Sequence, residues 1–178
     1  MPVSLHEACQ PLALLLGEWH GSGRGQYPGL TEFEYREQVT FSHVGKPFLT
    51  YSQKTQNVFD GQPLHSEQGF LRIIDDKKLE MVVAQPTGIV EVHDGFYASN
   101  PESCLINLHA TQVSGTATAK PVEQVQRLLR IADNVLTYNV SMAAGGEPIQ
   151  QHLEASLERA PSSAEDTTPL CEEPQRQQ

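Results

Sequence analysis

The most constraining feature of the sequence is a glycine at every second position over residues 21–25. Gly21, Gly23 and Gly25 follow Trp19, the single tryptophan of the chain. Because alternate residues of an extended strand point to the same side, this spacing leaves one face of a strand without side chains. Such a strand packs poorly by itself, so another backbone or a bound ligand must approach that face closely. We therefore predict a first strand at the corner of a barrel, with Trp19 filling the barrel end.

The residues after these glycines end the strand and do not begin a helix. Tyr27-Pro28-Gly29 is a turn sequence, because proline and glycine favour the dihedral angles of tight turns. A phosphate-binding loop is a poor alternative, since no apolar strand precedes the glycines, no helical pattern follows them, and the Gly-Lys-Ser/Thr ending is missing.

From residue 32 onward the hydrophobic pattern has a period of two, which is typical of antiparallel strands with one buried face. Phe33, Tyr35, Val39 and Phe41 share one face of the first such strand. Turn sequences separate further predicted strands at 48–58, 69–74, 79–84, 88–99, 103–110, 122–131, 135–142 and 149–157. About ten strands at short intervals predict an all-β fold, a meandering antiparallel β-barrel in which closure removes the sheet edges.

Three segments carry helical signals. Residues 7–16 predict one or two helical turns, which end at Gly17 and close one end of the barrel. Residues 122–131 and 151–160 contain good helix formers, so propensity alone favours helices there. Their neighbours and the family resemblance described below favour strands, because tertiary context overrides so weak a preference.

The composition changes at Pro161, which divides the chain into two parts. Residues 1–160 are expected to form the β-barrel domain. Residues 161–178 offer almost nothing to bury and are expected to be a disordered acidic and polar tail. The tail could simply be solubilising, or it could bind a partner or regulate the protein.

Charge and cysteine content restrict the partners and the compartment. The net charge of −10 and pI near 5.1 argue against nucleic acid as a partner. No apolar run is long enough to span a bilayer and no signal peptide is evident, so we expect a cytoplasmic protein without a membrane partner. Cys9, Cys104 and Cys171 are an odd, widely spaced set, which indicates free thiols in a reducing compartment.

The histidines do not form a zinc-enzyme motif. His65-Ser66-Glu67 resembles the start of a deaminase motif, but no Pro-Cys-x-x-Cys completes it, and no His-Glu-x-x-His is present. His6, His20, His93 and His109 are isolated and are expected to be surface residues or satisfied polar groups.

Four ordered motifs extend over about residues 10–160. They are Gly17-x-Trp19-x-Gly21-x-Gly23-x-Gly25-x-Tyr27-Pro28-x-Leu30, Ser42-His43-Val44-Gly45-Lys46-Pro47, Pro63-Leu64-His65-Ser66-Glu67-Gln68-Gly69-Phe70 and Gln151-His152-Leu153-Glu154-Ala155. Together they resemble the nitrobindin family, small haem-binding β-barrels that are similar to fatty-acid-binding proteins and lipocalins.

The resemblance implies a haem b site and assigns residues to it. His152 matches the histidine that is the axial ligand of the haem iron, and His65 matches a residue of the pocket wall where small ligands bind. Leu64, Phe33 and Met142 resemble apolar pocket residues, although each could equally be plain barrel core. Gly29 falls at a cofactor-binding position where relatives commonly carry threonine, so any haem contact from that hydroxyl is lost.

Strand parity conflicts with the role of His152. In a regular strand His152 shares a face with Glu154 and Ser156, opposite Leu153 and Ala155. His152 then points outward unless a bulge or the barrel rim turns it inward.

The function that the resemblance implies is a haem-dependent peroxynitrite isomerase. Its ferric form converts peroxynitrite to nitrate, its ferrous form binds nitric oxide, and tyrosine nitration is thereby limited. No other catalytic group is visible in the sequence. A carrier of a hydrophobic ligand and a haem nitric oxide sensor without turnover remain alternatives, and the sequence leaves open whether the barrel forms a homodimer and which redox state the iron has in the cell.

Overall fold

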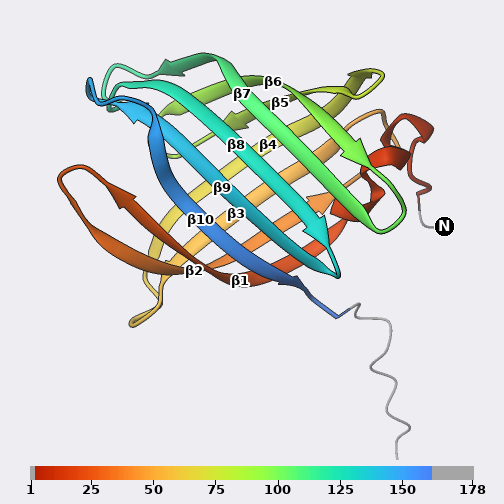
Figure 1. Cartoon of the computed structure of the whole chain (residues 1–178), viewed down its shortest axis with the longest axis horizontal. Coiled ribbons are helices and arrows are strands. Elements are labelled where there is room, and N and C mark those ends of the chain that lie inside the picture. The colour runs from red at the N-terminus through yellow and green to blue at the C-terminus, as the bar shows by residue number, and fades with distance from the viewer. Residues whose placement is uncertain (1–2, 162–178) are drawn as a thin grey trace, which may run out of the picture.

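Ten antiparallel strands close into a barrel in the computed structural model, which describes residues 3–161 (Figure 1). Each strand pairs with its neighbours in sequence, and β1 pairs with both β2 and β10, so no sheet edge is left. The elements are η1 (Glu7–Leu15), β1 (Gly17–Tyr27), β2 (Leu30–Ser42), β3 (Leu49–Asn57), β4 (Pro63–Asp75), β5 (Lys78–Ala84), β6 (Ile89–Ser99), β7 (Ser103–Gly115), β8 (Val122–Ala132), β9 (Val135–Ala144) and β10 (Gln150–Arg159). The predicted ten-stranded meander is confirmed, and the predicted tail lies outside the described residues from position 162 onward.

The two segments with helical propensity are strands. β8 pairs with β9 along its length and with β7 over residues 126–132, and β10 pairs with β9 and β1. Because both neighbours of each strand supply ladder hydrogen bonds and a shared buried face, tertiary pairing outweighs the intrinsic helix preference.

A 3₁₀ helix closes one end of the barrel, as predicted for residues 7–16. η1 buries Cys9, Leu12 and Leu15 against the barrel interior. Trp19 is fully buried beside it, and its indole N–H donates to the carbonyl oxygen of Leu15 at 2.8 Å. The guanidinium of Arg159 stacks 4.1 Å from the indole centroid, so the first and last strands are joined at the closed end.

The glycines of β1 face the barrel interior, and other groups fill the space beside them. A Cβ at Gly21 would lie 2.8 Å from the Cα of Leu157 in β10. A Cβ at Gly23 would collide with the ring of Tyr35, and one at Gly25 with the ring of Phe33. The predicted close approach is confirmed, and it comes from a neighbouring backbone and two aromatic rings of β2.

Two of the three cysteines lie within the described residues. Cys9 and Cys104 are free and buried, and burial raises the pKa of both, that of Cys104 to about 11. Cys171 lies outside the described residues. Within residues 3–161, no helix has the length and apolar character needed to cross a bilayer.

The interior differs between the two ends of the barrel. Towards η1, the ends of the strands fill the barrel with an apolar core that includes Phe41, Leu49, Leu71, Ile106, Leu136 and Leu157. At the opposite end the side chains do not meet across the barrel, and they leave a cavity.

Candidate functional site

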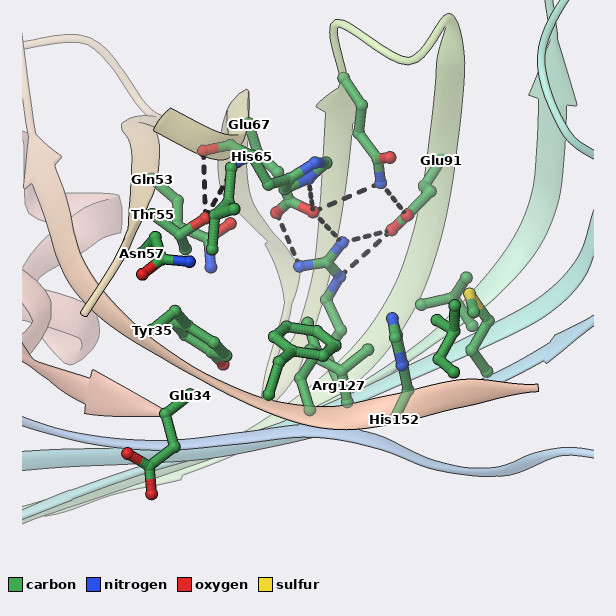
Figure 2. A pocket seen from close by; sticks show the side chains of 18 of the residues that line it. Glu34, Tyr35, Gln53, Thr55, Asn57, His65, Glu67, Glu91, Arg127 and His152 are labelled. Carbon is green, nitrogen blue, oxygen red and sulfur yellow. Dashed lines mark hydrogen bonds and ion pairs between the residues drawn. The ribbon is translucent and has the colours of Figure 1, made fainter. Parts of the chain in front are cut away.

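The cavity at the open end has a volume of about 500 Å³, within the range of small-molecule sites. Part of its lining is apolar and part is strongly polar. The apolar lining consists of Leu30, Phe33, Leu64, Val125, Val140, Met142 and Leu153, and the polar lining includes Gln53, Thr55, Asn57, His65, Glu67, Gln85, Glu91, Arg127 and His152 (Figure 2). Such a cavity suits a ligand that has a large apolar body and a few polar contacts.

A β-bulge turns His152 into the cavity. Gln151 pairs with Ser141 of β9 and Leu153 pairs with Val140, so His152 is the extra residue of β10. Because a bulge shifts strand parity, His152 and Leu153 both line the cavity although they are adjacent in sequence. The conflict between the alternation of β10 and an inward-facing His152 is thereby resolved.

One ring nitrogen of His152 is held by the backbone of β1. Its Nδ1 lies 2.9 Å from the carbonyl oxygen of Gln26, which itself lies where β1 is out of register with β2. A carbonyl oxygen only accepts hydrogen bonds, so Nδ1 carries a proton, and in the neutral imidazole Nε2 then keeps its lone pair. Figure 2 shows the imidazole extending from its strand into the cavity. This arrangement is typical of a histidine that ligates a metal through Nε2.

Tyr27 supports the same imidazole from the side. The rings of Tyr27 and His152 pack edge to face with centroids 5.4 Å apart. The Tyr27 hydroxyl accepts a hydrogen bond from the backbone N–H of Ala144 at 2.7 Å, which fixes the tyrosine against β9. The orientation of His152 is therefore set by three strands.

The structure brings together five of the six residues that the sequence assigned to the site. His152, His65, Leu64, Phe33 and Met142 all line the cavity. Leu64 lies at the rim and is 48% exposed. The sixth residue, Gly29, lies outside the cavity lining in the turn between β1 and β2, with φ of +79° and open space around it.

A buried ion cluster in the cavity wall was not foreseen from the sequence. Arg127 of β8 donates to Glu67 of β4 from Nη1 and Nη2, both at 2.8 Å, and to Glu91 of β6 from Nη2 at 2.7 Å (Figure 2). Burial alone would raise the pKa of both carboxyls, but the guanidinium charge and the hydrogen bonds outweigh it and hold each pKa below its usual value. Both glutamates are therefore ionised near neutral pH.

Neutral and imidazole groups complete the hydrogen bonds of this cluster. Gln85 donates to Glu91 at 2.7 Å, and the Tyr51 hydroxyl donates to Glu67 at 3.0 Å. Nε2 of His65 lies 3.4 Å from Glu67, and Nε2 of His93 lies 2.7 Å from Glu91. The expectation for His93 was wrong in one respect, because the ring is fully buried and its Nδ1 has no partner in the described structure.

Strand parity was the signal that could have revealed the cluster. Arg127 falls on the same face as Val125, Leu129 and Ile131, which predicts an inward position for a charged side chain. A charge on the apolar face of a strand requires a buried partner of opposite sign.

A second polar network adjoins the cavity, because two of its members, Tyr35 and Gln53, line it. This network centres on Glu37 of β2. The Tyr138 hydroxyl donates to Glu37 at 2.7 Å and lies 2.8 Å from the hydroxyl of Tyr35. Gln53 also donates to the carboxyl. Burial raises the pKa of Glu37 to about 7, because these neutral donors offset only part of the cost of burying the charge.

The raised pKa of Glu37 predicts a specific pH dependence of stability. Ionising Glu37 is harder in the folded protein than in the unfolded chain, so its contribution to stability is present below pH 4.5 and is lost as the pH rises to about 7. We expect Glu37→Gln to gain up to about 3 kcal/mol relative to wild type between pH 5 and pH 8. Urea unfolding at pH 5, 6.5 and 8 measures this difference. Glu32→Gln, an exposed change on the same strand, is the control, and a Glu37→Gln difference that is constant with pH would contradict the assignment.

A closed antiparallel barrel with one sealed end, one open cavity and an inward-facing imidazole defines a β-barrel that binds a small ligand in its interior. The family model described as the THAP4-like, heme-binding beta-barrel domain matches residues 8–159. The chain therefore belongs to this family, the nitrobindins, as the four sequence motifs predicted.

Curated relatives and a solved structure agree with this assignment. Peroxynitrite isomerase 2 of Mycobacterium avium is 47% identical over 159 residues, covering 89% of this chain and 99% of that protein. Peroxynitrite isomerase 1 of Mycolicibacterium paratuberculosis is 46% identical over the same length and coverage. The crystal structure of Rv2717c from M. tuberculosis superposes with a TM-score of 0.86 at 44% identity, covering 89% of this chain and all of that one.

Proposed function

We propose that this protein binds haem b in its cavity through Nε2 of His152 and, in the ferric state, isomerises peroxynitrite to nitrate. The observation that carries the proposal is the hydrogen bond from Nδ1 of His152 to Gln26, which leaves Nε2 as an unprotonated ligand inside the cavity. The family assignment and the names of the relatives support both the cofactor and the activity.

The residues present fit haem in their chemistry. A neutral imidazole is a common axial ligand of haem iron, and the hydrogen bond to a carbonyl raises its basicity. The apolar residues of the lining provide surface for the porphyrin ring. Burying several hundred Å² of mostly apolar surface contributes on the order of 10 kcal/mol before association costs. Apolar contact therefore supplies most of the affinity, while His152 fixes orientation and coordination.

The residues of the chain position the cofactor and exclude water from the cavity. Ferric haem, when bound, supplies a Lewis-acid iron that activates peroxynitrite for isomerisation to nitrate. His152 would bind the haem iron through Nε2. Gln26 and Tyr27 keep the imidazole in one orientation. The apolar walls restrict the access of water to the site where the substrate would bind. In the ferrous state the same site is expected to bind nitric oxide, and removal of peroxynitrite limits tyrosine nitration.

A fatty-acid-like carrier is the weaker alternative, for a reason visible in the cavity wall. Arg127 is the one lysine or arginine among the residues of 3–161 that line the cavity, and it is already bonded to two carboxylates. A third carboxylate, from a fatty acid, would meet two like charges at that position.

The test of the activity is the yield of nitrate from peroxynitrite. Haem-loaded ferric protein is expected to accelerate peroxynitrite decay and to raise the nitrate yield, while the haem-free protein and an equal amount of an unrelated barrel protein do neither. If the protein binds haem and nitric oxide but leaves peroxynitrite decay unchanged, the sensor without turnover is the correct function.

The charge and the thiols of the protein bear on its partners and its location. The net charge of −10 supports the absence of a nucleic-acid partner, and the free buried thiols support a reducing, cytoplasmic location. Size measurement tests whether the barrel forms a homodimer, and binding assays test whether the tail has a partner.

A further inference from the structure

The wall of the cavity carries more negative than positive charge. Within the cluster, Glu67 and Glu91 are both ionised and Arg127 supplies one compensating charge, which leaves one formal negative charge in excess. Glu34, an exposed residue, also lines the cavity and adds a further carboxylate. The three side chains of the cluster are nearly inaccessible to solvent, since that of Glu91 is 3%, that of Glu67 6% and that of Arg127 8% exposed. Solvent therefore screens this charge weakly, and its effect reaches the contents of the cavity.

The groups around the cluster do not cancel this excess when they are neutral. Tyr51 and Gln85 donate hydrogen bonds without net charge. His65 and His93 each place Nε2 toward one of the carboxylates and compensate only if they take up a proton. Glu37, below the cavity, adds a further negative charge when it is ionised.

The excess charge and the ligating histidine belong to the same cavity. His152 lines it from β10, and Glu67, Glu91 and Arg127 line it from β4, β6 and β8. An iron atom bound by His152 therefore lies in the field of the cluster. Ferric haem carries one more positive charge than ferrous haem, so a buried negative charge stabilises the ferric state more.

We propose that Glu67 and Glu91 set the reduction potential of the bound haem and favour its ferric state. This inference rests on the proposed haem site and explains which of its two chemistries prevails. The ferric form is the one assigned to peroxynitrite isomerisation, whereas the ferrous form binds nitric oxide. The two carboxylates would act on the iron electrostatically, without contacting it.

The test is the midpoint potential of the haem-reconstituted full-length protein, measured by spectroelectrochemistry at pH 8. This pH lies above the ordinary pKa of histidine, so proton uptake by an imidazole does not mask the change. Glu91→Gln is expected to raise the potential by about 60 mV, equivalent to a tenfold change in the ferric-to-ferrous ratio. Glu91→Asp keeps the charge and is expected to leave the potential near that of wild type. Glu80→Gln, which removes a half-buried carboxylate that pairs with Arg72 on the outer surface, is the second control.

Glu67→Gln provides an independent variant if Glu91→Gln does not fold, as judged by its far-ultraviolet circular dichroism. The inference is overturned if the folded glutamine variants keep the wild-type potential, or if Glu91→Asp shifts it as far as Glu91→Gln, since packing and not charge would then be responsible. If the wild-type protein leaves the Soret band of added hemin at the position seen for free hemin, the haem site itself is refuted. The two failures are therefore distinguishable.

Discussion

Replacing His152 by alanine is expected to remove the Soret band of histidine-ligated haem and to weaken hemin binding by more than about a hundredfold. Loss of a residue that only orients a ligand costs about 10–100-fold in metal affinity, and loss of the ligand itself costs more. The apolar lining remains in the variant, so some weak, unligated haem binding is expected. Titration with hemin, followed by absorption, measures both the affinity and the coordination state.

His109→Ala is the matched control for this experiment, because His109 is exposed on β7 and lies outside the cavity lining. It is expected to leave the spectrum unchanged. Free imidazole added to His152→Ala is expected to restore a ligated spectrum, because the space left by the side chain can admit it. An unchanged Soret band in His152→Ala would mean that another group ligates the iron.

Replacing Arg127 by methionine is expected to cost about 3–5 kcal/mol of folding stability at pH 7, because it leaves two carboxylates buried without a counter-charge. In the native protein Arg127 lowers the pKa of Glu67 and Glu91, so their contribution to stability is present above the ordinary glutamate pKa and is lost as the pH falls. The difference between Arg127→Met and wild type is therefore expected to shrink on acidification to pH 4. Urea unfolding at both pH values measures it.

A triple variant separates lost charge compensation from lost packing. Glu67→Gln, Glu91→Gln and Arg127→Met together remove every charge of the cluster, and most of the lost stability is expected to return. If the triple variant is as unstable as Arg127→Met alone, unpaired charge is not the cause of the loss.

The fold was predictable because its signals are local. Alternating polarity and frequent turns predict an antiparallel sheet, and closure into a barrel removes its edges. β8 and β10 are strands despite their helix formers because each has two pairing neighbours. The position of His152 was not predictable from alternation. A single bulge reverses parity, and the residues of β10 alone do not show where the strand slips against β9.

The buried ion cluster was missed for a different physical reason. Glu67, Glu91 and Arg127 stand on three strands, and their contact depends on the register between strands that are far apart in sequence. Parity places each one on the inner face, but only the closed barrel brings them together. Glu37 was overlooked in the same way, although it shares the inner face of β2 with Tyr35 and Val39.

The bare face of β1 determines how wide the cavity can be. At Gly25 the three atoms nearest to a would-be Cβ all belong to the ring of Phe33, which also lines the cavity, and they include Cε1 at 2.7 Å. A methyl group at that position would therefore force this ring to move. The missing side chains of β1 therefore set the position of Phe33, so a substitution at Gly25 would change the width of the cavity without altering His152.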